Sequence, residues 1–271
     1  MTNTILITGA SSGIGRATAK HFHAKGWNVI ATMRNPERED DLTTFENTLV
    51  TRLDVLETAS IDQAAASGIE RFGRIDVLLN NAGYGAYGPL EAFDIDGIRR
   101  QFDTNVIGLL AVTKSVLPHM RANRSGTIIN ISSIGGKMAF PLGTLYHGTK
   151  FAVEGLSEAL RFELDAIGVK VKIVEPGSIK TDYIGRSFDF RNDESMTEYQ
   201  AAVRSFLDSV KPMTQHASPP ELVADVIYGA ATDGSHQLRY AAGEDARQLI
   251  ANRKTQDDDT LFSAIKSQMG L

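Results

Sequence analysis

Short apolar runs rich in β-branched residues alternate along this chain with segments of helical length, and this alternation limits the fold more than any other feature. Several runs are almost continuously apolar, as strands are when helices cover both faces of a parallel sheet. The predicted strands are residues 4–8, 28–33, 48–53, 75–80, 126–132, 169–175 and 238–241. The predicted helices are residues 14–25, 58–72, 98–122 and 149–167, with another from Pro220 to about 231. Strands separated by helices are typical of repeated βαβ units, which predicts an α/β fold with a doubly wound parallel sheet.

The length of the chain, 271 residues, suits one large domain or two small ones. No Pro-, Gly- or Ser-rich linker divides it, and no internal repeat is present. We therefore expect a single Rossmann-type domain over residues 1–271, with a seven-stranded sheet in the order 3-2-1-4-5-6-7. Residues 183–216 break the alternation and exceed a normal connection between strand and helix. Such a segment predicts a lid over a substrate site.

Composition excludes several classes of function. The net charge is −5, so the chain has no basic excess with which to bind phosphates, and no nucleic-acid partner is expected. The absence of cysteine excludes disulfides, thiol nucleophiles and Cys-ligated zinc, and no metal site is expected. No apolar run reaches the ~18 residues of a membrane span, and the N-terminus does not have the pattern of a signal peptide. A reducing, cytoplasmic location is therefore predicted.

A glycine-rich turn, TGASSGIG at residues 8–15, lies between the first strand and the first helix. Its glycines follow the pattern G-x-x-x-G-x-G and leave room for a diphosphate close to the backbone. The following helix offers free N–H groups and the positive end of its dipole, and two serines add hydroxyl donors. An ordinary glycine turn is the alternative. The residues assigned to a dinucleotide are Gly9, Ser11, Ser12, Gly13, Ile14 and Gly15.

Three residues suit the transfer of a proton to or from a carbonyl oxygen. Tyr146 and Lys150 are four residues apart and share a face of the predicted helix, and Ser133 follows the strand GTIINIS, 13 residues before Tyr146. Ligands of open α/β sheets bind at that end of the strands. A nearby ammonium should lower the pKa of Tyr146, and Ser133 can hydrogen bond to the same oxygen. Alternatively, Tyr146 packs the helix and Lys150 is solvated.

The glycine spacing, with the Ser-Tyr-Lys set, resembles the classical short-chain dehydrogenase/reductase family. The stretches VIATMRNPE and NNAGYGAYGPLE are similar to its 17β-hydroxysteroid-dehydrogenase-like branch. The resemblance implies that Asn105, in DTNVIG, completes the catalytic set by holding a water that links Lys150 to solvent. It also implies that Tyr146 and Lys150 contact the cofactor. Further cofactor-binding residues implied by the resemblance are Asp54, Val55, Asn81, Ala82, Gly83, Pro176, Gly177, Ile179 and Thr181.

The sequence departs from the family pattern between Tyr146 and Lys150. The intervening residues are His-Gly-Thr, where the family often has small residues ending in serine. His147 is bulky, and we expect it to point away from the site.

The end of the second strand indicates which nicotinamide cofactor is used. An acidic side chain there binds the ribose 2′-OH of NAD, whereas an arginine suits the 2′-phosphate of NADP. Met33 occupies the position of the acid and Arg34 follows it. A guanidinium matches the geometry of a phosphate, so NADP(H) is favoured over NAD(H). The alternative is that Arg34 is a solvated turn residue.

The predicted substrate pocket is mostly apolar, and it has no cluster of Arg or Lys for a phosphorylated substrate. Its predicted residues are Tyr84, Tyr87, Met138, Phe140, Leu142, Tyr183, Phe188 and Phe190. Such walls suit a small hydrophobic ketone or aldehyde and its alcohol, interconverted by hydride transfer with the cofactor.

Two other functions remain open at this stage. One is a dinucleotide sensor without catalysis, and the other is an epimerase or dehydratase of the same superfamily. The resemblance also implies a homodimer or homotetramer through helices 98–122 and 149–167.

Overall fold

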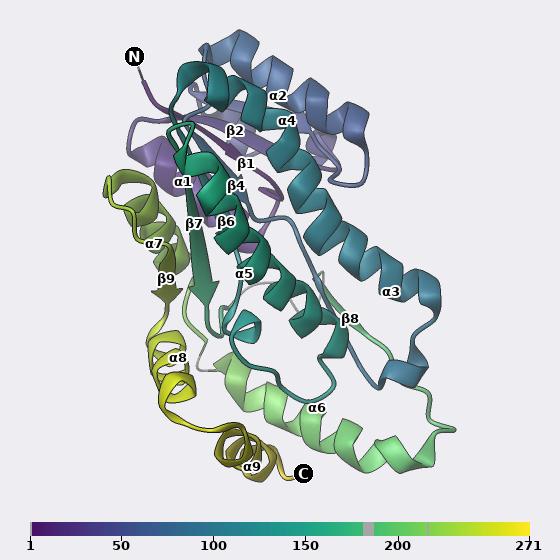
Figure 1. Cartoon of the computed structure of the whole chain (residues 1–271). Coiled ribbons are helices and arrows are strands. Elements are labelled where there is room, and N and C mark those ends of the chain that lie inside the picture. Colours follow the sequence, from purple (N-terminus) through teal and green to yellow (C-terminus); the bar gives the residue numbers. More distant parts are fainter. Residues whose placement is uncertain (1, 181–186, 216) are drawn as a thin grey trace.

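The computed structural model describes residues 2–180, 187–215 and 217–271, and contains a parallel sheet of seven strands in the order β3-β2-β1-β4-β6-β7-β9 (Figure 1). In chain order among these seven strands, this is the predicted order 3-2-1-4-5-6-7. Every predicted strand is confirmed to within two residues. The strands are β1 (Thr4–Ile7), β2 (Asn28–Met33), β3 (Thr48–Arg52), β4 (Val77–Asn80), β6 (Gly126–Ile131), β7 (Val169–Pro176) and β9 (Arg239–Ala242).

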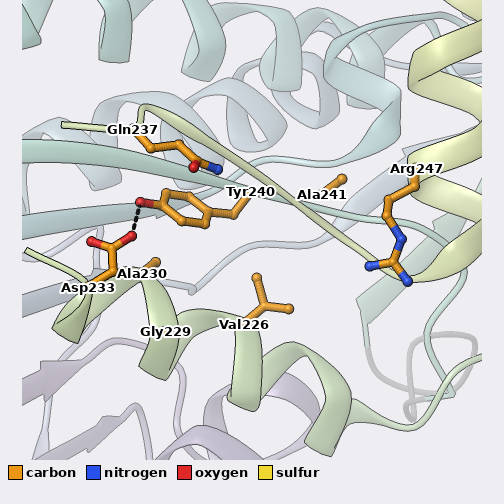
Figure 2. A pocket seen from close by; sticks show the side chains of 8 residues that line it. All are labelled: Val226, Gly229, Ala230, Asp233, Gln237, Tyr240, Ala241 and Arg247. Carbon is orange, nitrogen blue, oxygen red and sulfur yellow. Dashed lines mark hydrogen bonds between the residues drawn. The ribbon is translucent and has the colours of Figure 1, made fainter. Parts of the chain in front are cut away.

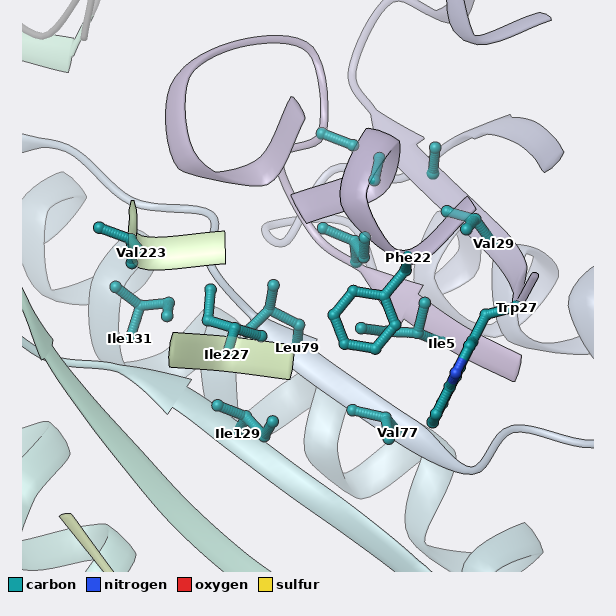
Figure 3. Close-up of a cluster of buried hydrophobic side chains, with 14 of the residues drawn as sticks. Ile5, Phe22, Trp27, Val29, Val77, Leu79, Ile129, Ile131, Val223 and Ile227 are labelled. Carbon is teal, nitrogen blue, oxygen red and sulfur yellow. The ribbon is translucent and has the colours of Figure 1, made fainter. Parts of the chain in front are cut away.

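Helices cover both faces of this sheet, which explains why its strands are apolar along their length. The helices α1 (Gly13–Ala24) and α7 (Pro220–Thr232) pack on one face. Figure 3 shows the core beneath them, where Phe22 and Ile227 meet alternate residues of the strands. The other face is covered by α2 (Thr58–Phe72), α4 (Gly108–Asn123) and α5 (Thr144–Asp165). The sheet order reverses between β1 and β4, the place where doubly wound folds bind ligands.

Two predicted helices differ from those observed. The helix predicted over 98–122 is divided into α3 (Ile95–Phe102), a π-helical turn (Asp103–Ile107) and α4. The helix predicted to start at residue 149 starts at Thr144, because the amide of His147 already bonds the carbonyl of Gly143, 2.8 Å away. The earlier start puts Tyr146 in the first turn of α5.

Several elements at the carboxyl ends of the strands were not predicted. The strands β5 (Gly85–Tyr87) and β8 (Phe188–Phe190) pair in parallel as a second sheet. The helices α6 (Gln200–Gln215) and α8 (Glu244–Thr255), which were also not predicted, lie at this end of the molecule (Figure 1). The helix α9 (Asp258–Met269) lies there too, and it begins at the acidic run Asp257–Asp259, which the sequence indicates as a helix start. Short 3₁₀ turns are Pro36–Arg38, Leu42–Thr44, Leu90–Ala92, Ile134–Gly136 and Thr197–Tyr199. In the part of the chain that the structure describes, no helix has both the length and the apolarity needed to cross a membrane.

Candidate active site

The glycine-rich turn joins β1 to α1, as the sequence predicts. A side chain at Gly15 is excluded, because a Cβ there would lie 2.3 Å from the carbonyl oxygen of Gly9. Ser12 is the N-cap of α1, but its side chain makes no capping hydrogen bond, and the first turn carries no acidic residue. The first N–H groups of α1 therefore have no acceptor within the helix or from its cap. This uncapped helix end fits the diphosphate of a dinucleotide.

Thr8 and Asn81 hold the glycine-rich turn against the end of β4. The hydroxyl oxygen of Thr8 accepts hydrogen bonds from the amides of Asn81 (2.9 Å) and Ala82 (3.0 Å). The side-chain amide of Asn81 donates to the carbonyls of Thr8 (2.9 Å) and Gly9 (3.1 Å). Asn81 thus braces the turn, a role that the sequence did not reveal. The role of Thr8 could have been predicted from the sequence, because Thr8 directly precedes Gly9, the first glycine of the motif.

The remaining residues assigned to the adenosine half lie at the ends of β2 and β3. Arg34 follows β2 and is exposed, and the described residues make no hydrogen bond or ion pair with its side chain. Met33 is buried, at 3% exposure, and packs in the core on the α1 face of the sheet. Asp54 accepts a hydrogen bond from the amide of Leu56 (3.0 Å), which shapes the loop after β3. Val55 in that loop packs beside Gly108.

The structure brings Ser133, Tyr146 and Lys150 together beyond the carboxyl end of β6. Ser133 caps the 3₁₀ turn that follows β6, and its hydroxyl oxygen accepts from the amide of Gly135 at 3.0 Å. Its side chain also interacts with the phenol of Tyr146 and favours the ionised form of that phenol. Lys150 Nζ donates to the carbonyl of Ile131 at 2.9 Å and lies 5.7 Å from the centre of the Tyr146 ring.

Burial dominates the electrostatics of this group. It raises the pKa of Tyr146 above its ordinary value of 10, an effect that the interaction with Ser133 opposes. Burial lowers the pKa of Lys150 from 10.5 to about 8, against the effect of the Glu154 carboxylate. The prediction that Lys150 lowers the pKa of Tyr146 is therefore wrong for this structure. Desolvation of the phenol outweighs the opposing effect of Ser133, and the Lys150 ammonium bonds to the carbonyl of Ile131.

Asn105 lies in the π-helical turn between α3 and α4, and its side chain joins two segments around the site. Its amide nitrogen donates to the carbonyl of Tyr84 (2.8 Å) and to Thr149 Oγ1 (3.1 Å). Its amide oxygen accepts from the backbone N–H of Tyr84 at 3.1 Å. The hydroxyl of Thr149 in turn donates to the carbonyl of Tyr146 at 2.7 Å. Asn105 thus anchors both the loop after Gly83 and the helix α5, and its role in proton relay stays a prediction.

The segment after β7 is held by α8, a helix that the sequence did not reveal. Pro176 ends β7, and the amide of Gly177 donates to the carbonyl of Ala242 at 3.0 Å. Asp245, in the first turn of α8, accepts from the amide of Ser178 at 2.7 Å. Ile179 pairs with Ser218 in an isolated bridge. Thr181 and Tyr183, predicted to contact cofactor and substrate, lie outside the described residues.

Aromatic rings extend from Tyr146 toward the predicted lid. The ring of Tyr87 lies 5.4 Å from that of Tyr146, 5.3 Å from Phe188 and 5.6 Å from Phe206. Phe190 stacks on the ring of Phe206 in α6 at 6.0 Å, but Phe206 is 4% exposed. The half-buried rings of Tyr87, Phe188 and Phe190 therefore form an aromatic surface, and Phe206 packs behind it. Phe206 was not among the predicted pocket residues.

Two predictions about the segment between Ser133 and Tyr146 need correction. Met138 is 2% exposed and packs in a core cluster with Leu261 and Ile265 of α9, so it does not line a pocket. His147 does not point away from the site. Its side chain is buried, and its ring lies 5.6 Å from the Tyr146 ring in an edge-on arrangement. Met138 is covered by a helix distant in the sequence, whereas His147 bonds to the backbone of the loop that precedes it.

A hollow of about 450 Å³ lies away from these residues, between α7, β9 and α8 (Figure 2). Tyr240 donates to Asp233 at 2.6 Å in this hollow, and both side chains bond to the buried Lys172. It contains none of the predicted site residues. Its lining residues are Val226, Gly229, Ala230, Asp233, Gln237, Tyr240, Ala241 and Arg247.

The sequence is similar to those of known oxidoreductases over most of the chain. An uncharacterized oxidoreductase of Schizosaccharomyces pombe is 46% identical over 243 residues, which cover 88% of this chain and 100% of that protein. The 17-beta-hydroxysteroid dehydrogenase type 1 of Mus musculus is 31% identical over 252 residues, covering 87% of this chain and 72% of that enzyme.

Solved structures and a family sequence model agree with these relatives. A short-chain dehydrogenase from Streptomyces avermitilis has a TM-score of 0.83 at 34% identity, covering 98% of this chain and 96% of that one. ElxO with NADP bound has a TM-score of 0.73 at 30% identity, covering 90% of this chain and 98% of that one. The sequence model of the short chain dehydrogenase family matches residues 3–192. From its sheet order, its glycine-rich turn and these matches, the chain belongs to the short-chain dehydrogenase family.

Proposed function

We propose that this protein is an NADP(H)-dependent oxidoreductase that interconverts a hydrophobic ketone or aldehyde and its alcohol. One observation carries the proposal: Ser133, Tyr146 and Lys150 converge beyond the end of β6, at the sheet edge that also carries the uncapped end of α1. A dinucleotide sensor would need only the second of these two features. Burying ionisable side chains such as Tyr146 and Lys150 reduces the stability of the fold, and ionisable groups with shifted pKa values are concentrated at active sites.

The residues at the cofactor end fit NADP(H). The N–H groups that begin α1 suit the diphosphate, and the exposed Arg34 suits the 2′-phosphate. ElxO, 30% identical, was solved with NADP. When bound, the cofactor supplies the hydride. The residues proposed to hold it are Gly9, Ser11, Ser12, Gly13, Ile14, Gly15, Arg34, Asp54, Val55, Asn81, Ala82, Gly83, Tyr146, Lys150, Pro176, Gly177, Ile179 and Thr181.

Tyr146 gives its hydroxyl proton to the carbonyl oxygen during reduction. Burial raises its pKa, so the phenol is protonated at neutral pH and ready to act as an acid. Ser133 donates a hydrogen bond to the same oxygen and stabilises its developing charge. Lys150 places a positive charge below the ring, and Asn105 orients the helix that carries both residues.

The aromatic surface of Tyr87, Phe188 and Phe190 supports an apolar substrate. We propose that residues 183–216 act as the lid over this surface. Of these, 183–186 and 216 lie outside the described residues, whereas β8 and α6 are described. A homodimer or homotetramer would form through residues 98–122 and α5, where Ile107 of the π-helical turn and Phe151 and Phe162 of α5 are exposed. A cytoplasmic location stays a prediction.

A panel of carbonyl compounds tests the activity, with NADPH consumption followed by absorbance. Cyclic and aryl ketones and medium-chain aldehydes should be reduced, and sugars and phosphorylated ketones should not. Tyr228→Phe is the matched control, because Tyr228 packs on Phe22 and Trp27 on the opposite face of the sheet. It should retain wild-type turnover. Failure of the wild type to oxidise NADPH or NADH with any apolar carbonyl compound would overturn the proposal.

A further inference from the structure

Both ring nitrogens of His147 are hydrogen bonded to the backbone of the loop between Ser133 and Tyr146. Nε2 accepts from the amide of Phe140, 3.0 Å away. Nδ1 lies 3.0 Å from the carbonyl oxygen of Gly135. An amide must donate and a carbonyl must accept, so the imidazole is neutral with its proton on Nδ1. The ring therefore connects two points of the loop that are five residues apart.

The ring also fills the space between these two points. A Cβ on Gly135 would lie 2.7 Å from Nδ1, and a Cβ on Gly143 would lie 2.5 Å from Cδ2. The rings of Phe140 and Tyr87 pack against it at 5.7 and 6.0 Å, from the loop and from β5. The position is thus shaped for an imidazole, with glycine on both sides of it.

The loop is also strained two residues beyond Phe140, outside the stretch that His147 connects. Leu142 has φ of 58°, a conformation that branched side chains rarely adopt. Its carbonyl accepts from the amide of Gly88 at 2.8 Å. Strained residues persist only where neighbouring contacts hold them.

The two hydrogen bonds of His147, here called the clamp, are connected to Ser133 through Gly135. The carbonyl of Gly135 accepts from His147, and the amide of the same residue donates to the Ser133 hydroxyl at 3.0 Å. Ser133 in turn interacts with the phenol of Tyr146, the residue that Lys150 also faces. A change at His147 is therefore transmitted through one glycine to a hydroxyl at the proposed reaction centre.

We propose that His147 is a positioning residue for Ser133, acting through Gly135 as the neutral Nδ1–H tautomer. The inference rests on the proposed function, in which Ser133 orients the carbonyl oxygen. It does not require His147 to touch the substrate. The identity of the residue matters because a small side chain here would leave the two ends of the loop unconnected.

Steady-state kinetics of His147→Ala, His147→Asn and His147→Gln test this role. His147→Ala should lower kcat on the order of 10- to 100-fold, the effect of a misplaced group, and leave the Kd for NADPH unchanged. Asparagine can restore the donor to Gly135 and glutamine the acceptor for Phe140, so each should recover part of kcat. His119→Ala is the matched control. Its Nε2 also accepts a backbone amide, that of Ile75 at 3.2 Å, but it lies on α4, and turnover should be unchanged.

A double-mutant cycle separates positioning from general loss of structure. If His147 acts through Ser133, His147→Ala should add little to the loss already caused by Ser133→Ala. Losses that multiply, or wild-type kcat in His147→Ala, would overturn the inference while leaving the proposed function intact. An inactive wild type would overturn the proposed function instead. Nitrogen-15 NMR of the wild-type ring is independent of activity: Nδ1 should carry the proton, and an Nε2–H tautomer would also contradict the inference.

Discussion

Lys150 donates from Nζ to the carbonyl oxygen of Ile131, 2.9 Å away, and this bond ties α5 to the end of β6. The side chain is 9% exposed, and burial lowers its pKa from 10.5 to about 8. The folded protein therefore keeps a cation where desolvation disfavours it. Groups of this kind are retained for function at the expense of stability.

Replacing Lys150 by methionine should stabilise the protein at neutral pH. The lowered pKa of Lys150 means that, below pH 8, keeping this side chain charged reduces the free energy of unfolding by about 3 kcal/mol. The substitution also removes the hydrogen bond to Ile131, and this loss offsets about 1 kcal/mol of the gain in stability. From pH 8 to 10.5 the unfolded wild type binds more protons than the folded protein, so wild-type stability rises with pH and the advantage of Lys150→Met shrinks. Urea unfolding of both proteins at several pH values measures the difference in their free energies of unfolding.

The control for that experiment is Lys114→Met, which removes an exposed lysine from α4. Its effect on the free energy of unfolding should be small and independent of pH. A difference between Lys150→Met and wild type that stays constant from pH 7 to 10 would show that the buried cation is not costly.

Arg34→Ala should raise the KM for NADPH at least tenfold and leave the KM for NADH nearly unchanged, because only NADPH has a 2′-phosphate. Loss of a charge-assisted hydrogen bond costs about 1.5–3 kcal/mol. Arg99→Ala removes the same charge from an exposed position of α3 and serves as the control. Initial rates at varied NADPH and NADH concentrations give the two KM values for the wild type and for each variant. A wild type that prefers NADH would refute the assignment.

The main sheet and the proposed catalytic trio could be predicted because their signals are local. Apolar runs mark the strands, the glycines of residues 8–15 mark the turn, and helical spacing puts Tyr146 and Lys150 on one face. The topology of a doubly wound sheet then brings strand ends together. Ser133 could be placed near them for that reason.

The remaining features depend on contacts between distant segments. Nothing in DTNVI interrupts a helical pattern; the π-helical turn there accompanies the bonds of Asn105 to Tyr84 and Thr149. Met138 is core only because α9 returns to cover it. The two bonds of His147 depend on the path of the loop, which no local pattern encodes.

Exposed aromatic side chains on α5 provide a test of assembly. Phe162 is 82% exposed and Phe151 is 47% exposed, and burying such a side chain contributes about 1.5–3 kcal/mol. The double variant Phe151→Asp/Phe162→Asp should therefore dissociate an assembly formed through this helix, with a lower mass by light scattering. Phe262→Asp, at a 48% exposed position of α9, should leave the mass unchanged. A wild type that is monomeric at every concentration would contradict the proposed assembly.

The proposed lid should respond to ligands. Amide hydrogen exchange in β8 and the first half of α6 should slow when NADP(H) and an apolar carbonyl compound are both present, because the aromatic surface then has a substrate to cover. The amides of β3, at the far edge of the sheet, provide the internal reference. Equal protection of residues 188–209 with and without ligands would indicate a fixed element.

Turnover of Tyr146→Phe tests the central claim most directly. The substitution removes one hydroxyl and keeps the ring that packs on Tyr87, so folding and the Kd for NADPH should be unchanged. Loss of the general acid should lower kcat for carbonyl reduction by about 10²–10⁴-fold. A Tyr146→Phe enzyme that binds NADPH and reduces the carbonyl compound at the wild-type rate would contradict the role of Tyr146 as the acid and the mechanism built on it.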